Sequence, residues 1–302
     1  MTQIEITFLG TTAGIPTKSR NHAALYIRYQ SENEFCMLFD CGEGTQKQIF
    51  TAGLNFMRID NIFITHWHAD HFAGLLGLLE TMNLEGRKKP LNIYGPEACN
   101  FVEGILVLGY AKKGFEVNAI DVNFDGTEIT TVFEDTEFTI QSIPMKHGIP
   151  AVAYAFVEKD RVKIDKEKAK KLGLPPKGLI FKKLKEHGST EYKGRTIKLE
   201  EIAKIEKGKK IAYSGDTMPN NNMIKLAENA ELLIHDATFF DEPDARKHAN
   251  LEEVMKIAEE ANAKQIILTH ISRRYQDIEE MKKKIEKYSH VKIAKDFMKV
   301  VL

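Results

Sequence analysis

The sequence predicts an α/β fold of sheets layered with helices, and three observations lead to it. Apolar or alternating runs typical of strands recur along the chain, at residues 4–9, 24–29, 35–39, 91–96, 138–143, 152–157, 209–214, 232–238, 266–270 and 291–294. Helical spacing of apolar residues fills stretches between them, at 74–84 and from 251 onward. Several strand-like runs lead directly into histidine or aspartate. At 302 residues the chain is long enough for a large core, and we expect one domain over residues 1–302.

Composition limits the classes of function. The 43 basic and 43 acidic residues cancel, so the whole chain has no net field that would favour nucleic acid. Three cysteines form no disulfide framework, which is a reduced, intracellular pattern. The sequence starts on a strand without a signal-like segment, and no apolar run approaches the roughly 18 residues of a membrane span. We therefore expect a soluble, cytoplasmic protein with no membrane partner.

The N-terminal elements follow from local pattern. Residues 4–9 alternate as a half-buried strand and end in the small residues 10–14, which allow close backbone approach. A polar loop with two cations follows, and then a strand pair at 24–29 and 35–39 around a polar turn. Residues 40–48 turn into a helix.

A dense group of metal-competent side chains follows the apolar run at 62–64. His66, His68, Asp70 and His71 lie within six residues. Imidazoles and a carboxylate are the usual ligands of Zn²⁺, and buried polar groups at a strand end are costly unless something pairs them. His66 and His68 can chelate one ion from a turn. Asp70 and His71 point elsewhere, which suits a second ion close by.

This His-x-His-x-Asp-His pattern resembles the signature of the metallo-β-lactamase superfamily, which implies a four-layered αββα sandwich. The resemblance narrows at residues 16–21, Pro-x-Lys-x-Arg-Asn, and at 40–46, which are similar to ribonuclease Z, the tRNA 3′-processing endonuclease family. It implies that Lys18, Arg20 and Asn21 bind the acceptor end of tRNA.

Later strands deliver the remaining predicted ligands. The strand at 138–143 leads to His147, the strand at 209–214 leads to Asp216, and the strand at 266–269 ends at His270. We also expect a helix at 97–111, short strands between 117 and 143, and a helix around 275–288. The resemblance implies two Zn²⁺ ions per subunit, with Mn²⁺ as a possible substitute. It assigns the ligands as follows: His66, His68 and His147 to the first ion, Asp70, His71 and His270 to the second, and Asp216 as the bridge.

The implied chemistry is attack of a metal-activated hydroxide on a phosphodiester, which leaves a 3′-hydroxyl on the tRNA. Besides being a predicted ligand, Asp70 is a candidate for the general base that orients the hydroxide. His248 lies just before a helix capped by Asn250 and Glu253, and it is the candidate proton donor, with Asp236 raising its pKa. We interpret four other histidines as structural or without a role: His22, His187, His235 and His290.

Residues 158–198 differ in charge from the remainder, with fourteen Lys and Arg against six Asp and Glu. This inserted basic segment, net +8, predicts a protruding arm that binds a phosphate backbone, and the resemblance implies that it grips tRNA. The alternative is a solvated, lysine-rich insertion. The resemblance also implies a homodimer.

The predicted function is a zinc-dependent endoribonuclease that removes the 3′ trailer of precursor tRNA. One alternative is a small-molecule metallo-hydrolase, either glyoxalase II-like or a phosphodiesterase, which would share the metal ligands but give no reason for the basic arm. A second alternative is a non-catalytic RNA-binding module, which does not explain seven metal ligands. Steep salt dependence separates RNA processing from small-ester hydrolysis.

Overall fold

The computed structural model describes residues 2–108, 114–240, 248–275 and 278–302. The chain divides into two compact units. The first, here called the core unit, comprises Met1–Asp135, Thr139–Val157 and Lys210–Leu302. The second, here called the basic unit, comprises Thr136–Phe138 and Glu158–Lys209.

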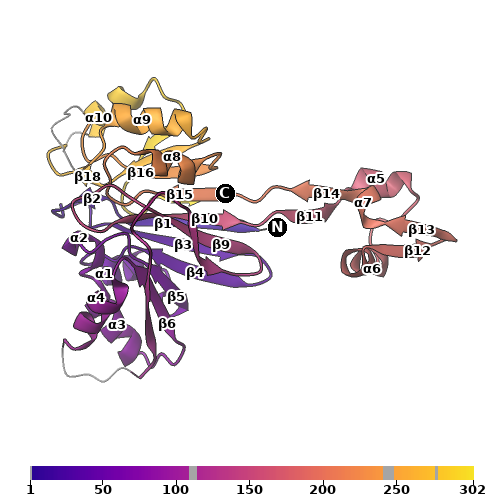
Figure 1. The fold of residues 1–302 in the computed structure, drawn as a ribbon, viewed down its shortest axis with the longest axis horizontal. Helices are drawn as coiled ribbons and strands as arrows, with labels where there is room; N and C mark the ends of the chain where they lie inside the picture. The colour runs from indigo at the N-terminus through magenta and orange to yellow at the C-terminus, as the bar shows by residue number, and fades with distance from the viewer. Residues whose placement is uncertain (1, 109–113, 241–247, 276–277) are drawn as a thin grey trace. The chain divides into compact units, whose positions relative to one another are not determined.

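The core unit contains two seven-stranded sheets (Figure 1). The first sheet has the order β20-β1-β3-β4-β5-β6-β7 and the second has the order β19-β17-β16-β15-β10-β9-β8. The strands of the first sheet are β1 (Gln3–Gly10), β3 (Ala24–Gln30), β4 (Glu34–Phe39), β5 (Ile59–Phe63), β6 (Leu91–Gly95), β7 (Val117–Asp121) and β20 (Lys299–Val301). Those of the second are β8 (Thr130–Glu134), β9 (Phe138–Pro144), β10 (Val152–Glu158), β15 (Lys210–Tyr213), β16 (Leu232–Asp236), β17 (Ile266–Thr269) and β19 (Val291–Ile293). A separate parallel pair joins β2 (Thr12–Ala13) to β18 (Ile271–Ser272).

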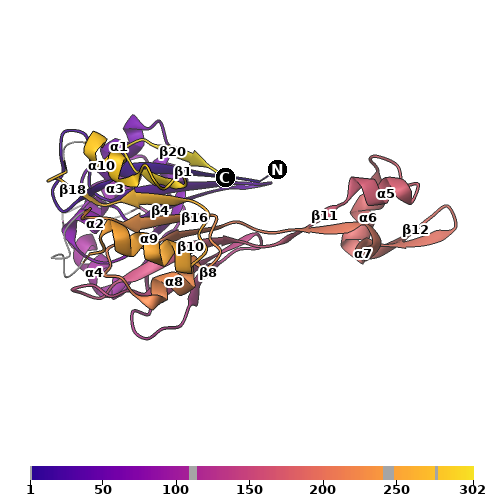
Figure 2. The ribbon, with the colours of Figure 1, turned by 90° about the horizontal axis from the view of Figure 1, so that it is seen from above.

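Helices cover the outer face of each sheet (Figures 1 and 2). Those beside the first sheet are α1 (Thr45–Thr51), α2 (Ala69–Phe72), α3 (Leu75–Leu84) and α4 (Ala98–Leu106), with the 3-10 helix η1 (Phe56–Arg58). Those beside the second are α8 (Asn221–Ala227), α9 (Leu251–Glu260) and α10 (Ile278–Ile285). The predicted αββα sandwich is confirmed. Residues 109–111 of the helix expected at 97–111 lie outside the described residues, as do 276–277 of the helix expected at 275–288.

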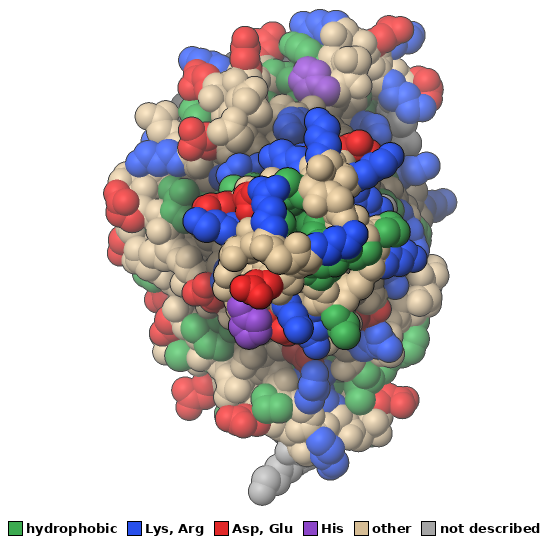
Figure 3. All heavy atoms as spheres, turned by 90° about the vertical axis from the view of Figure 1, so that its right-hand side faces the viewer, with side chains coloured by type: hydrophobic (Ala, Val, Ile, Leu, Met, Phe, Trp, Pro, Cys, Tyr) green, Lys and Arg blue, Asp and Glu red, His purple; other side chains and the backbone are tan. Residues whose placement is uncertain are grey.

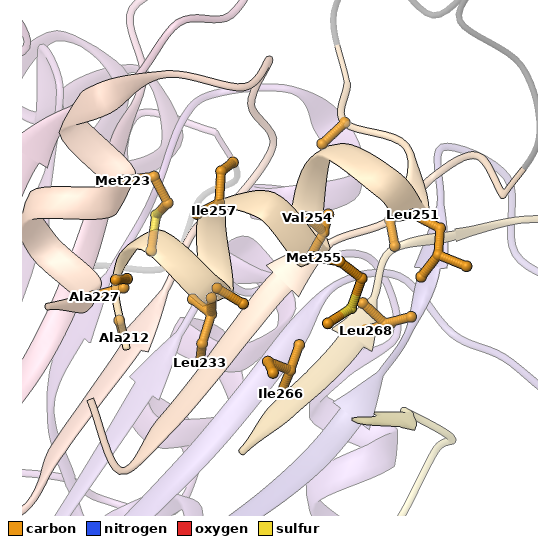
Figure 4. Packing of buried hydrophobic residues seen from close by; sticks show 14 of the residues in the cluster. Ala212, Met223, Ala227, Leu233, Leu251, Val254, Met255, Ile257, Ile266 and Leu268 are labelled. Atoms are coloured by element: carbon orange, nitrogen blue, oxygen red, sulfur yellow. The ribbon is translucent and has the colours of Figure 1, made fainter. Parts of the chain in front are cut away.

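Local sequence explains how the helices dock. The inward face of α3 buries Leu75, Leu78, Leu79 and Met82, as its apolar spacing requires. The helix α9 begins at the predicted N-cap: the Asn250 side chain accepts from the Glu253 backbone N–H, and the Glu253 carboxylate accepts from the Asn250 N–H. Figure 4 shows the apolar face of this helix packed on β15, β16 and β17.

The two sheets meet through aromatic side chains. Phe63 of β5 stacks between Phe39 and Tyr94, with ring centroids 4.9 and 4.7 Å away, and meets the edge of Tyr154 from the second sheet at 5.5 Å. The Tyr154 hydroxyl donates to the Ile64 carbonyl at 2.9 Å. Aromatic pairs of this kind bury large areas and fix geometry. They hold the end of β5, just before the histidine cluster, against the second sheet.

Parallel pairing places the ends of several strands at one edge of the unit. In the first sheet β4 and β5 are parallel neighbours, and in the second β15, β16 and β17 are parallel neighbours. The residues that follow these strands therefore emerge side by side, which is where ligand sites form in open α/β sheets. No helix among the described residues has the length and apolar character of a membrane span.

The basic unit has a small core of its own, which sequence analysis did not anticipate. Its elements are β11 (Arg161–Ile164), α5 (Lys166–Lys171), α6 (Leu179–His187), β12 (Ser189–Tyr192), β13 (Arg195–Lys198), α7 (Leu199–Ile202) and β14 (Ala203–Glu206). Its buried residues are Ala169, Leu174, Leu184, Ile197 and Ile202. The unit extends to Lys209, beyond the predicted limit of 198, because β14 pairs antiparallel with β11.

The charge of this unit lies on its surface. From Glu158 to Lys209 there are 17 Lys and Arg residues and nine Asp and Glu. Several acidic residues are engaged in ion pairs, among them Lys163 with Glu206 and Lys207 with Asp160. Lysines of α5 and α6, such as Lys170 and Lys185, are exposed. Figure 3 shows Lys and Arg side chains gathered with exposed hydrophobic ones on the face that it draws.

Candidate metal centre

All seven predicted metal ligands converge at the strand edge described above. His66 and His68 follow β5, and Asp70 and His71 lie on α2, which His68 caps. The other three follow strands of the second sheet: His147 after β9, Asp216 after β15 and His270 after β17. Gly215 must be a glycine, because it has φ +56° and a Cβ there would lie 2.6 Å from the Thr65 Cβ. This close approach brings Asp216 up to the histidine cluster.

The first group of possible ligands contains His66, His68, His147 and Asp216. The His68 Nδ1 lies 3.0 Å from the His66 Nε2 and 3.2 Å from the His147 Nε2. The Asp216 Oδ2 lies 3.7 Å from the His66 Nε2. Three imidazole nitrogens and one carboxylate oxygen thus surround one point.

The second group contains Asp70, His71, His270 and again Asp216. The Asp216 Oδ1 lies 3.2 Å from the His71 Nε2 and 3.3 Å from the His270 Nε2. The Asp70 Oδ2 lies 3.3 Å from the His270 Nε2. Asp216 therefore offers one oxygen to each group, as expected of a bridge.

These distances fit divalent cations. Metal–ligand bonds of about 2.0–2.2 Å in a tetrahedral site place ligand atoms roughly 3.3 Å apart, which matches both groups. The buried Asp216 Oδ1 has no hydrogen-bond partner among the described residues, although two imidazole nitrogens face it. A buried carboxylate oxygen without a donor is costly unless a cation satisfies it. The donor set and its spacing therefore support a site for divalent metal.

Two threonines orient the histidines, and sequence analysis missed both. The Thr65 hydroxyl donates to Asp40, so its oxygen can only accept from the His66 Nδ1, 3.0 Å away. The Thr238 hydroxyl donates to Asp236 at 2.6 Å and accepts from the His270 Nδ1 at 2.9 Å. With the proton on Nδ1 in each ring, the Nε2 lone pairs of both histidines face the cluster.

Asp40 is a third group that sequence analysis did not assign. Its fully buried carboxylate accepts from the His71 Nδ1 at 2.8 Å, from the Tyr213 hydroxyl at 2.7 Å and from the Thr65 backbone N–H at 2.8 Å. It fixes the tautomer of His71 so that Nε2 faces Asp216. The sequence signal that could have identified Asp40 is its position directly after β4, the strand that pairs with β5.

His248 and Asp236 form a pair beside both ligand groups. The His248 Nδ1 lies 2.8 Å from the Asp236 Oδ2, and its ring stacks on that of His270 at 5.5 Å. Burial lowers the pKa of His248, but the Asp236 carboxylate outweighs this, so the pKa lies above its ordinary value. Burial raises the pKa of Asp236, but the His248 charge outweighs this, so the carboxyl stays ionised. The structure thus brings together the two residues predicted from the chain.

The three predicted substrate-binding residues lie in the loop at 15–22, but their environments differ. Lys18 is exposed, whereas Arg20 is buried and donates to the Thr11 hydroxyl at 2.6 Å and to the Ala294 carbonyl at 2.7 Å. The Asn21 side chain donates to the Glu43 carbonyl at 2.8 Å. Arg20 and Asn21 thus make internal hydrogen bonds here. The loop borders a cavity of about 510 Å³, whose opposite wall contains Ser272, Arg273 and Tyr275, shortly after His270.

The remaining histidines belong to neither ligand group. His235 is buried and bonds to the Asp236 carbonyl, and His290 is exposed on the core unit. His187 ends α6 in the basic unit. His22 is buried and contacts the backbone carbonyl of Gly14.

The fold and the paired ligand groups define a protein of the metallo-β-lactamase class. The family described as "Beta-lactamase superfamily domain" matches residues 185–271, and that described as "Anti-Pycsar protein Apyc1" matches residues 4–168. The chain is 40% identical to ribonuclease Z of Archaeoglobus fulgidus, over 97% of this chain and 96% of the relative, and 42% identical to that of Thermococcus gammatolerans, over 90% and 85%. The chain belongs to the ribonuclease Z family.

A solved structure agrees with this assignment. The short form of human tRNase Z is 28% identical to the chain, with a TM-score of 0.69 and 98% of both chains covered. The Bacillus subtilis protein YhfI, at 20% identity and a TM-score of 0.67, shares the fold.

Proposed function

We propose that the protein is an endoribonuclease that removes the 3′ trailer of precursor tRNA and leaves a 3′-hydroxyl on the tRNA. The observation that carries the proposal is the convergence of two ligand groups on Asp216, with the His248–Asp236 pair beside both. Two metal positions in one site suit displacement at a phosphodiester, where charge develops on both the attacking and the leaving oxygen. Family membership supports precursor tRNA as the substrate.

We assign one cation to His66, His68 and His147 and one to Asp70, His71 and His270, with Asp216 shared. The nitrogen-rich donor set favours Zn²⁺, and Mn²⁺ is a substitute. When bound, the two cations supply a water of lowered pKa and neutralise phosphate charge. Three of the seven side chains, His66, His71 and His270, are held in place by Thr65, Asp40 and Thr238, so little rearrangement of these histidines is needed for binding.

The protein side chains have separate tasks in this scheme. Asp70 borders the cluster through its Oδ2 and is assigned both as a ligand and as the base that orients the attacking water. His248 is assigned as the proton donor to the leaving 3′-oxygen of the tRNA. Asp236 accepts from the Nδ1 of His248, which leaves Nε2 to carry the proton that is transferred.

Replacement of His248 with alanine tests the proton donor. Cleavage of precursor tRNA is expected to fall by about 10²- to 10⁴-fold, because the sugar alkoxide is a poor leaving group without a proton. Hydrolysis of a p-nitrophenyl phosphodiester is expected to change far less, since p-nitrophenolate leaves unprotonated. The measurement is the cleavage rate of His248→Ala relative to the wild type on each of the two substrates, with His290→Ala as the control. Equal losses on the two substrates would contradict the assignment.

We assign the tRNA acceptor end to the cavity beside residues 15–20. Lys18 on one wall and Arg273 on the other are exposed cations that suit phosphate groups. Arg20 and Asn21, which we expected to contact the substrate directly, are assigned to hold the loop in shape.

Two substitutions in this loop are expected to act differently. Lys18→Ala should weaken RNA binding and lower the slope of log affinity against log salt by about one. Arg20→Ala should lower the free energy of unfolding by about 2 kcal/mol, because buried partners of a charged donor lose their hydrogen bonds. Binding titrations over salt and denaturant unfolding measure the two effects, with Lys256→Ala on α9 as the control. If Arg20→Ala kept the wild-type stability but lowered the slope of log affinity against log salt, Arg20 would bind RNA directly and its assigned structural role would be wrong.

We infer that the basic unit binds the tRNA backbone, that the protein acts as a homodimer, and that it works in the cytoplasm. The exposed lysines of α5 and α6 support the first inference through counterion release. Sedimentation equilibrium tests the second, since a mass of about 34.3 kDa at working concentration would exclude the dimer.

A further inference from the structure

A single residue, Gly14, connects His22 to a predicted metal ligand. The backbone N–H of Gly14 donates to the Asp70 Oδ2 at 2.9 Å. The carbonyl of the same residue lies 3.1 Å from the His22 Nε2. Because a carbonyl can only accept, the His22 proton is on Nε2. His22 is 7% exposed, and its Nδ1 has no hydrogen-bond partner among the described residues. This histidine has no part in the scheme above.

The surroundings of His22 are built for a close fit. A Cβ on Gly42 would lie 2.5 Å from the Cβ of His22 and 2.2 Å from the backbone oxygen of Asp70. Glycine at this position therefore allows the His22 side chain and the Asp70 backbone to approach each other from two sides. His22 and the backbone of Asp70 in α2 thus both pack against Gly42.

The loop between Thr11 and His22 is fixed at both ends. Asp296 accepts from the Thr11 hydroxyl at 2.8 Å and from the Asn21 backbone N–H at 2.7 Å. Within the loop, β2 pairs with β18, which directly follows His270. Gly14 itself has φ +59°, a left-handed conformation that glycine adopts readily. The hydrogen bond from His22 holds this flexible residue on its carbonyl side.

The Asp70 Oδ2 is the oxygen that faces the cluster, 3.3 Å from the His270 Nε2. A carboxylate oxygen has two lone pairs. One can accept from the Gly14 N–H while the other points toward the second ligand group. The orientation of this oxygen therefore depends on where Gly14 is held.

We propose that His22 is a positioning residue for the second ligand group: it holds Gly14 in place through the carbonyl oxygen of that residue, so that the Gly14 N–H orients the Asp70 carboxylate for a divalent cation. The proposal rests on the proposed function in that the second group binds a cation. Partners of this kind typically change metal affinity by 10- to 100-fold when removed. The effect should be confined to the second group, because the described contacts of His22 do not include His66 or His147.

The test is a Zn²⁺ titration of the chelator-stripped full-length protein against a chromophoric chelator. His22→Phe keeps a ring at this position and removes the donor, and one of the two binding steps should lose about 10- to 100-fold in affinity while the other stays unchanged. His22→Gln, whose amide can donate to the Gly14 carbonyl, should restore most of this loss. The control is His290→Phe at an exposed position. In kinetics with subsaturating Zn²⁺, kcat should fall while KM for RNA stays unchanged.

The outcomes separate the two proposals. Two wild-type binding steps that remain unchanged in His22→Phe would overturn the role of His22 alone. Equal weakening of both steps, with a lowered Tm of the stripped protein and no rescue by glutamine, would also overturn it by showing a general packing role. Fewer than two binding steps in the wild type would instead refute the two-cation scheme of the proposed function.

Discussion

Replacement of Asp216 with alanine is expected to reduce RNA cleavage by on the order of a thousandfold or more while RNA binding persists. Asp216 is the residue common to both ligand groups, with one oxygen toward His66 and the other toward His71 and His270. Its loss removes a shared negative charge from a buried cluster of imidazoles. Neither group then keeps its full set of donors.

Single-turnover cleavage and an RNA-binding titration, performed on the same preparations, measure the two properties of this variant. The control is Asp125→Ala, which removes a carboxylate at an exposed position of the core unit, from a residue that belongs to neither ligand group. Metal content should fall together with activity. Turnover close to the wild type would contradict the assignment of Asp216 as a bridge.

Removal of most of the basic unit is expected to raise KM for precursor tRNA by about a hundredfold and to leave hydrolysis of a small phosphodiester nearly unchanged. The described structure offers a clean position for the cut, because Ile164 of β11 pairs with Ala203 of β14. An Asn-Gly turn in place of residues 165–202 closes this ribbon as a two-residue hairpin. The variant loses the exposed lysines of α5 and α6, so its affinity for RNA should depend less on salt.

A matched variant separates charge from fold in this prediction. Substitution of Lys170, Lys171, Lys183 and Lys185 by glutamine keeps the small core of the basic unit and removes exposed charge only. It should reproduce much of the rise in KM and the loss of salt dependence. Equal losses on RNA and on the small substrate in the shortened protein would refute the binding role.

Residues at strand ends were the part of the site that the sequence could predict. His66, Asp216 and His270 each follow an apolar run, and parallel strands bring their ends to one edge, so local pattern and topology agree. The capping box at Asn250 was likewise predictable, because its two residues lie three apart and bond to each other.

Other features depend on the direction of side chains and on distant pairing, which local pattern does not record. Arg20 looks like a loop cation in the sequence, yet it donates to the Ala294 carbonyl, 274 residues away. The role of Asp40 appears only when β4 and β5 lie side by side. In the basic unit, the return strand β14 was hidden because its pairing with β11 spans about forty residues.

The most direct test of the proposed function is a cleavage assay on a precursor tRNA with a 3′ extension, in Zn²⁺ or Mn²⁺, with mapping of both product ends. The proposal predicts a cut directly after the discriminator base, with a 3′-hydroxyl on the tRNA and a 5′-phosphate on the trailer. A thioester and a simple phosphodiester are assayed beside it. Activity on these small esters with an intact precursor tRNA would contradict the proposal and would assign the metal centre to a small-molecule hydrolase.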